Sequence, residues 1–361
     1  MTDRIYNFSA GPAVLPEPVL ERAKEGMVSL DGSGLGVMEI SHRSKLFGKV
    51  LQSATSGLRD LLNVPENYKI LFLQGGATLQ FSMVPMNLLP LNGTADHIVT
   101  GTWGTKAAKE AARFGNVNVI YDGMPDGFRK VPCQENLRFD PGARYIHFTS
   151  NETIDGVEFR YDLDGHGVPV VCDASSNILS KPIDVEKYAL IFAGAQKNIG
   201  PSGITVVIIR EDLLGQVHRE LPPLLTYRAI AENDSLLNTP NTWGIYLTSL
   251  VCDWLKEQGG VSAMETRNHE KASVLYEAID SSDGFYTASV AKEARSMMNV
   301  TFRLPTVELT DQFCSEAESE GMTGLRGHRS VGGVRASIYN AFPKAGVQHL
   351  VEFMKDFASR N

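Results

Sequence analysis

The stretch AGAQKNIGPSGITVVII, Ala193 to Ile209, places a lysine in the turn between two apolar segments. The preceding run YALIFAG and the following run GITVVII are each typical of a strand that is buried on both faces. Too few residues separate them for a helical crossover, so the second strand is expected to run antiparallel to the first if the two pair. Burial in such a turn shifts a lysine amine toward its neutral, nucleophilic form, although Lys197 taken alone is better explained as an exposed turn lysine.

Upstream of this stretch, helix-like and strand-like segments alternate along the chain. Helices are expected over residues 17–28, 44–63, 77–89 and 105–115, and strands over residues 69–76, 97–104, 116–123, 145–153 and 168–176. Because the strands are apolar along most of their length, they predict an α/β fold with a mostly parallel sheet covered on both faces.

The sequence changes character after about residue 260. Two amphipathic strands and three helices follow, over residues 262–282, 296–304, 309–322, 332–340 and 349–360. This order predicts a smaller α+β domain at the C-terminus. We therefore expect a large domain over residues 17–259 and a small domain over residues 260–361, to which the N-terminal segment 1–16 also belongs.

The amino-acid composition argues against several classes of function. The chain has 361 residues and a formal net charge of −8, which argues against nucleic-acid binding and against a basic membrane-binding surface. Its four cysteines are scattered without a CxxC pair, so a zinc site is not expected and a reducing compartment is. No signal-like segment begins the sequence, and a cytoplasmic location is therefore the expectation.

Three predicted strands end in polar or glycine residues, and such ends meet at one edge of a parallel sheet, where ligands bind. Gly75 and Gly76 precede a helix and can cradle a phosphate, although on this motif alone a tight strand-to-helix turn is the better explanation. Asp173 ends a buried strand, where a carboxylate needs a positive partner or serves as a turn or helix cap. Trp103 is placed at another strand end, where its ring can stack on a ligand or simply fill the core.

Taken together, these features describe the needs of one cofactor. A neutral lysine condenses with an aldehyde, a buried aspartate holds a protonated pyridine nitrogen, and a glycine-rich helix start holds a phosphate. The combination of Lys197, Asp173 and the glycine pair therefore predicts a pyridoxal 5′-phosphate site.

The chain resembles the phosphoserine aminotransferases, class-V aminotransferases that share the aspartate-aminotransferase fold type. The resemblance covers essentially the whole chain. Its motifs, in order, are NFSAGPAVLP, SHRSKLF, QGGATLQF, GTWG, TSNET, CDASSN, AGAQKNIGPSG, LNTPNTWGIY and RGHRSVGGVRASIYNA. It implies a pyridoxal-phosphate-dependent transferase of fold type I, with a mostly parallel seven-stranded sheet in the large domain.

The resemblance also implies roles for individual residues. Lys197 is expected to carry the cofactor covalently and to move protons, Asp173 to pair with the pyridine nitrogen, and Trp103 to stack on the ring. Thr153 is expected to contact the phenolic oxygen of the cofactor. The residues implied to hold the cofactor phosphate are Ala77, Thr78 and Gln196 of one subunit and Asn238 and Thr239 of its partner in a homodimer.

The implied reaction moves an amino group between L-glutamate and 3-phosphohydroxypyruvate, giving O-phospho-L-serine and 2-oxoglutarate in serine biosynthesis. The resemblance also allows 4-phosphohydroxy-threonine as a substrate, in pyridoxine biosynthesis. Arg335 is expected to bind the α-carboxylate through a bidentate pair. The other implied substrate-binding residues are Ser9, His42, Arg43, His328 and Arg329, of which the two His-Arg pairs are assigned to the substrate phosphate.

Some members of the family have an arginine near the position of Thr78, and here the segment reads GGATLQF, so that contact is absent or another residue supplies it. The alternative within the same fold is a serine- or alanine-glyoxylate-type aminotransferase, which needs no phosphate-binding cations. A cysteine desulfurase is disfavoured because no cysteine lies in an obvious mobile loop. A hydride-transfer protein is disfavoured because no G-x-G-x-x-G follows the first strand, and an inactive scaffold is disfavoured by intact Lys197, Asp173 and Trp103.

Overall fold

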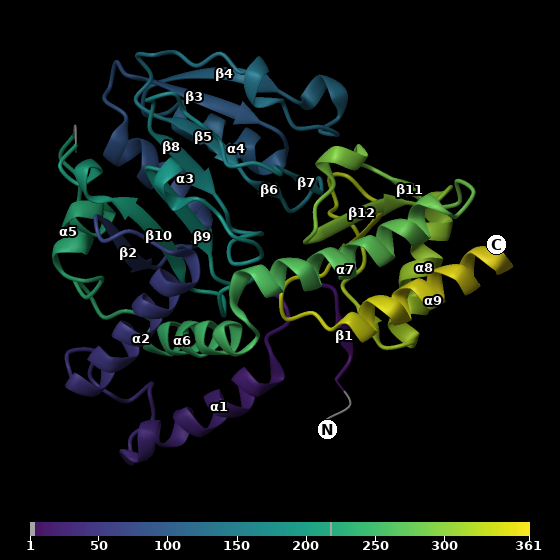
Figure 1. Cartoon of the computed structure of the whole chain (residues 1–361), viewed down its shortest axis with the longest axis horizontal. Coiled ribbons are helices and arrows are strands. Elements are labelled where there is room, and N and C mark those ends of the chain that lie inside the picture. The colour runs from purple at the N-terminus through teal and green to yellow at the C-terminus, as the bar shows by residue number, and fades with distance from the viewer. Residues whose placement is uncertain (1–3, 217–218) are drawn as a thin grey trace.

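The structure is a computed structural model that describes residues 4–216 and 219–361, and its centre is a seven-stranded sheet (Figure 1). The strand order is β2-β10-β9-β8-β5-β3-β4, and β10 is the one strand that runs antiparallel to its neighbours among these described strands. The strands are β2 (Tyr68–Leu73), β3 (Thr94–Val99), β4 (Asn116–Asp122), β5 (Ile146–Thr149), β8 (Val170–Asp173), β9 (Leu190–Gly194) and β10 (Thr205–Arg210). The predicted fold class, including the antiparallel strand after Lys197, is confirmed.

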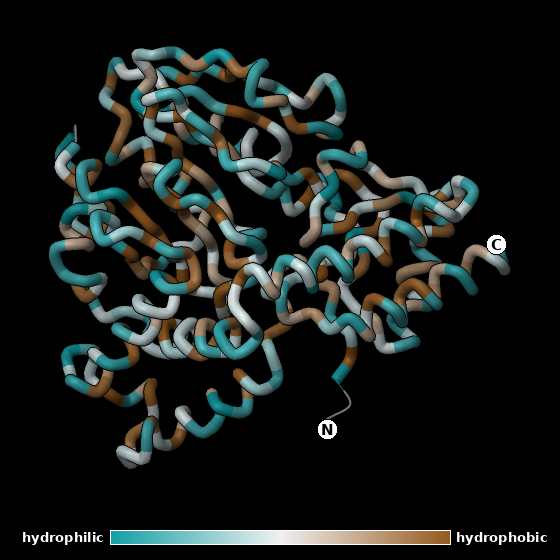
Figure 2. Tube along the Cα trace, in the orientation of Figure 1, coloured by the Kyte–Doolittle hydropathy of each residue, from teal (hydrophilic) through white to brown (hydrophobic). Residues whose placement is uncertain are grey.

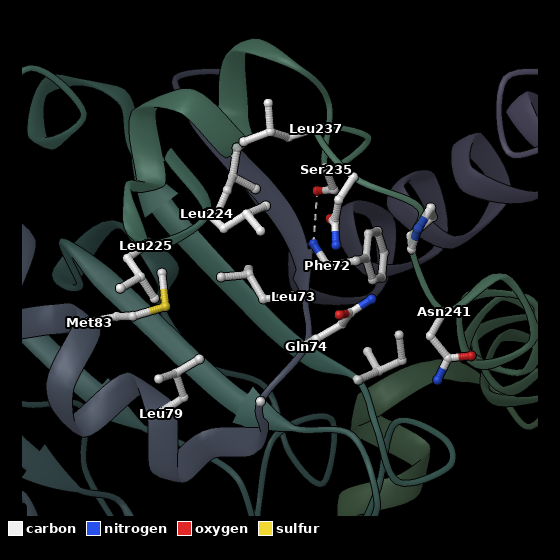
Figure 3. Close-up of a pocket in the computed structure, with 15 residues that line it drawn as sticks. Phe72, Leu73, Gln74, Leu79, Met83, Leu224, Leu225, Ser235, Leu237 and Asn241 are labelled. Atoms are coloured by element: carbon white, nitrogen blue, oxygen red, sulfur yellow. Dashed lines mark hydrogen bonds between the residues drawn. The ribbon is translucent and has the colours of Figure 1, made fainter. Parts of the chain in front are cut away.

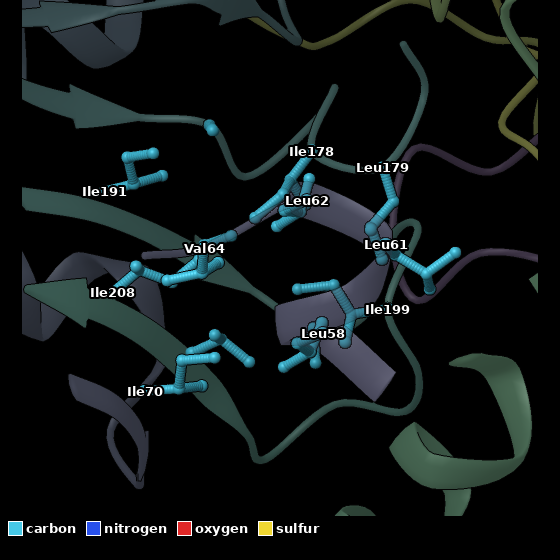
Figure 4. Close-up of a cluster of buried hydrophobic side chains, with 14 of the residues drawn as sticks. Leu58, Leu61, Leu62, Val64, Ile70, Ile178, Leu179, Ile191, Ile199 and Ile208 are labelled. Carbon is cyan, nitrogen blue, oxygen red and sulfur yellow. The ribbon is translucent and has the colours of Figure 1, made fainter. Parts of the chain in front are cut away.

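Helices cover both faces of this sheet, as the apolar strands require. On one face, Ile70, Ile191 and Ile208 belong to one buried cluster with residues of α2 (Lys45–Leu62) and α6 (Thr242–Glu257), and Figure 4 shows Leu58, Leu61 and Leu62 of α2 in this cluster. On the other face, the alternate strand residues Leu71, Phe192 and Val207 pack against α3 (Gly76–Leu88), α4 (Thr102–Ala111) and α5 (Tyr227–Glu232).

The ends of α2 follow from its sequence. The side chain of Ser44 accepts a hydrogen bond from the amide of Phe47, which caps the first turn, and Asn63 ends the helix in a left-handed conformation. The helix α1 (Glu17–Val28) packs against α6. Figure 2 shows the apolar residues concentrated along the strands and on the inward sides of the helices.

The C-terminal part has a separate hydrophobic core. It is built from α7 (Gly260–Asp280), α8 (Val307–Ser319), α9 (Lys344–Arg360) and a three-stranded antiparallel sheet of β11 (Thr287–Ala288), β12 (Asn299–Arg303) and β14 (Val334–Ser337). The N-terminal strand β1 (Tyr6–Asn7) pairs with β13 (Met322–Thr323), and Phe8 is fully buried in the same core. These contacts support the proposed division into residues 17–259 and residues 260–361 with 1–16, which stays a prediction.

One expectation from the sequence is wrong in detail. Trp103 was expected at the end of a strand, but β3 ends at Val99 and Trp103 lies in the first turn of α4. Two carboxylates cause this early helix start, since Asp155 accepts from the amide of Thr102 and Glu152 accepts from the amides of Trp103 and Gly104. None of the helices in residues 4–216 and 219–361 combines the length and hydrophobicity needed to cross a bilayer.

Candidate active site

The carboxyl ends of β5, β8 and β9 open into a cavity of about 320 Å³ between the two parts of the chain. The end of β2 also contributes, through the start of α3. Among the residues predicted for the site, those that line this cavity are Ala77, Thr78, Trp103, Thr153, Asp173, Gln196, Lys197, His328 and Arg335. The predicted convergence of three strand ends, those of β2, β5 and β8, is therefore confirmed.

Lys197 lies in the turn between β9 and β10 and reaches into the cavity. Its Nζ donates to Oγ1 of Thr153 at 2.5 Å. Burial lowers the pKa of the Lys197 amine to about 8, while Asp173 and Glu152 oppose this shift and Arg335 adds to it. The amine is thus closer to its neutral form at physiological pH than an exposed lysine is, which suits it to react with an aldehyde.

The N-terminal segment closes over this turn. The amide of Ala13 donates to the carbonyl oxygen of Gln196 at 2.8 Å, and a Cβ on Gly11 would come within 3.3 Å of the Gln196 side chain and 3.6 Å of the Lys197 side chain. Gly11 has φ of +149°, a conformation that favours glycine. The glycine of the N-terminal motif is therefore required by close approach to the lysine turn.

Asp173 ends β8 and is buried, with 3% of its surface exposed. Its Oδ1 accepts hydrogen bonds from the amide of Ser175 at 3.0 Å and from the Ser175 hydroxyl at 2.6 Å. Burial raises the pKa of the Asp173 carboxyl, although Ser175 and Lys197 oppose that shift. The turn role predicted for Asp173 is therefore observed. Its Oδ2 accepts no hydrogen bond from the described residues, so the geometry is compatible with the ligand role, which stays a prediction.

The start of α3 is shaped to receive an anion. Gly75 has φ of +93° and Gly76 has φ of +68°, and no side chain caps the first turn of the helix. The first amides of α3, around Ala77 and Thr78, therefore have no side-chain acceptor among the described residues. A phosphate fits this position on charge and on hydrogen bonding.

The residues of the cavity fit pyridoxal phosphate. They provide a half-buried lysine of lowered pKa, a carboxylate with a free oxygen, an uncapped helix start and the ring of Trp103 on one wall. Buried polar atoms without a partner in the described part of the chain also face this region, namely Oγ1 of Thr149, Oδ1 of Asn151 and Nε of Arg335. Such atoms are costly to leave unpaired, so a polar ligand is expected to satisfy them.

Positive side chains gather at the small-domain side of the cavity. Burial lowers the pKa of the His328 imidazole, and the nearby cations Arg335, Lys106 and Arg329 lower it further while Asp155 opposes them. The Arg335 guanidinium donates only to the carbonyl oxygen of Thr153, at 3.4 Å, and forms no ion pair within the described residues. Because the positive charge of this cluster is not balanced by ion pairs of Arg335 within the described residues, the cluster is suited to a substrate with more than one negative charge.

Several predicted residues do not line the cavity of their own chain. Asn238 and Thr239 are exposed, and Asn238 lies at a neighbouring apolar pocket of about 350 Å³ whose other walls include Leu73, Leu79 and Leu225 (Figure 3). The other predicted site residues that do not line the cavity are Ser9, His42, Arg43 and Arg329. Sequence reasoning also missed residues that do line the cavity, among them Ala10, Gly11, Phe81, Asn151, Ser175 and Ser176; all but Phe81 are small or polar and occur within the quoted motifs or beside their key residues.

Comparisons with known proteins agree with this geometry. The family model for aminotransferase class-V matches residues 5–350. The phosphoserine aminotransferase of Laribacter hongkongensis is 53% identical over 357 residues, which is 99% of each chain. The solved structure of phosphoserine aminotransferase from Bacillus circulans subsp. alkalophilus is 46% identical over all of both chains, with a TM-score of 0.98. The PLP-bound phosphoserine aminotransferase of Trichomonas vaginalis is 41% identical over 98% of this chain and all of its own, with a TM-score of 0.93.

Proposed function

Because this chain belongs to the class-V aminotransferase family, we propose that it is a pyridoxal-phosphate-dependent phosphoserine aminotransferase. It transfers the amino group between L-glutamate and 3-phosphohydroxypyruvate, giving O-phospho-L-serine and 2-oxoglutarate. The observation that carries this proposal is the single cavity that joins Lys197, Asp173 and an uncapped helix start to the His328 imidazole and the Arg335 guanidinium. Full-length similarity to phosphoserine aminotransferases at about half identity supports the same conclusion.

The bound cofactor supplies an aldehyde that takes up the amino group and a pyridine ring that accepts the electron pair of the substrate Cα–H bond. Asp173 would hold the ring nitrogen protonated, since its raised pKa reflects a buried carboxylate in need of a positive partner. The first amides of α3 and the side chain of Thr78 would hold the phosphate. Trp103 would cover one face of the ring and exclude water.

Lys197 has two tasks in this scheme. Its amine attaches the cofactor between turnovers, and it takes up and returns the proton at the substrate Cα once the substrate amine has displaced it. Thr153 fixes the side chain through its hydrogen bond to Nζ. A pKa of about 8 lets the amine accept and release protons near neutral pH, where a lysine of ordinary pKa is held protonated.

The pH dependence of cofactor uptake follows from this lowered pKa. When pyridoxal phosphate is added to the apoprotein, the initial rate at which visible absorption appears is expected to rise with pH and to level off above about pH 8. The rate rises with pH because the neutral amine is the nucleophile, and the fraction of neutral amine grows as the pH passes the pKa. Stopped-flow absorbance between pH 6 and 10 measures this, and a rate that rises without a bend up to pH 10 would show an ordinary lysine.

Arg335 is proposed to bind the α-carboxylate of both amino acids, because it lines the cavity and its buried Nε has no partner in the part of the chain that the structure describes. His328 and Arg329 are proposed to bind the substrate phosphate, together with His42 and Arg43. Ser9 is proposed to lie near the substrate as part of the N-terminal segment that covers the lysine turn. These assignments rest on the family resemblance and on the positive charge around His328.

A homodimer with shared active sites is proposed for two reasons. Asn238 and Thr239, assigned to the cofactor phosphate, are exposed on their own chain beside an apolar pocket. Large apolar side chains are also exposed at the end of α1, in the loop after it and near that pocket, namely Met27, Val28, Leu35, Met38 and Leu224. A second copy would bury such surface. Sedimentation equilibrium is expected to give twice the chain mass of 39.5 kDa, and a monomer at micromolar concentration would contradict the proposal.

The substrate class separates this proposal from a serine- or alanine-glyoxylate-type aminotransferase. We expect kcat/KM for glutamate with 3-phosphohydroxypyruvate to exceed that for serine or alanine with glyoxylate by about 100-fold or more, because a substrate without phosphate leaves the cations unpaired. Two separate assays measure this ratio: formation of 2-oxoglutarate from glutamate with 3-phosphohydroxypyruvate, and formation of glycine from serine or alanine with glyoxylate. Equal values would favour the glyoxylate type. Use of 4-phosphohydroxy-threonine and a cytoplasmic location stay predictions.

A further inference from the structure

The segment Asn151–Asp155 holds the start of α4 through the carboxylates of the buried Glu152 and the half-buried Asp155. Oε2 of Glu152 accepts the amide of Trp103 at 2.9 Å, and Oε1 accepts the amide of Gly104 at 2.8 Å. Oδ2 of Asp155 accepts the amide of Thr102 at 2.7 Å. Glu152 has no exposed surface and forms no ion pair within the described residues. Burial and the neighbouring Asp155 raise the pKa of its carboxyl to about 8, and the hydrogen bonds from the amides of Gly104 and Trp103 oppose this shift.

Two glycines leave room for the Glu152 carboxylate on either side of Trp103. A Cβ on Gly101 would lie 2.4 Å from Cδ of Glu152, and a Cβ on Gly104 would lie 3.2 Å from its Oε1. Glu152 therefore contacts the backbone of Trp103 directly, and the absence of side chains at Gly101 and Gly104 leaves space for that contact. The indole of Trp103 lines the cofactor cavity, and its position there depends on the hydrogen bonds between Glu152 and the start of α4.

The same segment also fixes two other groups of the site. Oγ1 of Thr153 accepts from Nζ of Lys197 at 2.5 Å, and the Thr153 carbonyl oxygen accepts from Arg335 at 3.4 Å. The segment forms a turn that is stabilised by the hydrogen bond from the Gly156 amide to the Glu152 carbonyl oxygen, at 2.8 Å. A displacement of Glu152 is thus expected to reach Trp103 directly, and Lys197 through the backbone of Thr153 and through the electrostatic effect of Glu152 on the Lys197 pKa.

We propose that Glu152 is a positioning residue that sets the orientation of Trp103 against the cofactor ring. This inference rests on the proposed function, since it requires pyridoxal phosphate in the cavity. A carboxylate is suited to the task because both of its oxygens accept hydrogen bonds, whereas glutamine would turn an amide donor toward one of the two N–H groups. Glu152 itself does not line the cavity and acts through Trp103.

The test compares E152Q with W103F and with the double variant, each as holoenzyme. E152Q is expected to keep the visible absorption band, because Lys197 is intact, but to lose most of the visible circular dichroism of the bound cofactor. Its cofactor dissociation constant is expected to rise about tenfold, a typical effect of losing hydrogen bonds to a buried charge. In the W103F background the same substitution is expected to change that constant less than twofold.

Glu158→Gln is the matched control, because Glu158 is also a buried carboxylate, in β7 (Val157–Glu158), and accepts from the amide of Met297 instead of from α4. It is expected to leave the dichroism and the cofactor dissociation constant unchanged. Gly104→Ala crowds the same carboxylate without removing it and is expected to reproduce the loss of dichroism, so the inference remains testable if E152Q does not fold.

Additive effects of E152Q and W103F on cofactor binding, with an intact wild-type band, would overturn this inference alone. Unchanged dichroism in both E152Q and G104A would also overturn it. A wild-type protein that forms no visible band with pyridoxal phosphate would overturn the proposed function, and this inference with it.

Discussion

Replacing Lys197 with alanine is expected to abolish the visible absorption band of the bound cofactor and to lower transamination by a factor on the order of 10⁴ or more. Both effects follow from one side chain, because the Lys197 amine is both the covalent attachment point and the group that moves the proton at the substrate Cα. The described residues around it offer no replacement. Arg335 is a guanidinium that stays protonated, and Thr153 is a neutral hydroxyl.

Absorbance spectroscopy and a transamination assay on the purified variant measure these effects. Lys181→Ala is a suitable control, because Lys181 donates to the carbonyl oxygen of Phe159 outside the cavity and is expected to leave both readouts unchanged. Retention of full turnover by K197A would show that the cofactor is not carried as proposed. Partial rescue of K197A by added primary amines would support the proton-transfer role specifically.

Substitutions of Arg335, His328 and Arg329 are expected to affect kcat/KM for glutamate and for O-phosphoserine in different ways. Arg335→Ala should lower kcat/KM about 100-fold or more for both glutamate and O-phosphoserine, because both carry an α-carboxylate and the variant leaves it buried without its guanidinium. His328→Ala and Arg329→Ala should lower kcat/KM mainly for O-phosphoserine, since glutamate has no phosphate. Steady-state kinetics of the two half-reactions give the required comparison.

Arg326→Ala tests whether loss of any positive charge in this loop has the same effect. Arg326 lies two residues before His328, forms an ion pair with Asp311 and does not line the cavity. We expect it to leave both substrates nearly unchanged. If Arg335→Ala impaired only O-phosphoserine, or if His328→Ala impaired glutamate equally, the proposed division between carboxylate and phosphate would be wrong.

The sequence predicted the parts of the site that depend on local chain direction. The apolar runs around Lys197 predicted two strands and the antiparallel β10, and the polar strand ends predicted which residues meet at one edge of the sheet. These features depend on patterns a few residues long. Hydrophobic periodicity and turn chemistry are therefore enough to predict them.

Other parts depend on contacts between distant segments and were missed. Trp103 was assigned to a strand end because nothing in GTWG reveals that Glu152 and Asp155, some fifty residues later, start a helix there. The burial of Glu152 was equally invisible, since a glutamate between two polar residues is usually solvated. The proposed homodimer would complete the site with Asn238 of a second copy, and no local sequence pattern encodes such a contact.

The most direct test of the account is the visible absorption spectrum of the protein loaded with pyridoxal phosphate, recorded alone and during titration with O-phosphoserine or with serine. Attachment to Lys197 predicts a yellow band in the unliganded protein. The cations around His328 and Arg335 predict that O-phosphoserine bleaches this band at concentrations at least about 100-fold lower than serine does. A band that serine bleaches as readily would contradict the phosphate-binding site, and the absence of any band would contradict the role of Lys197 itself.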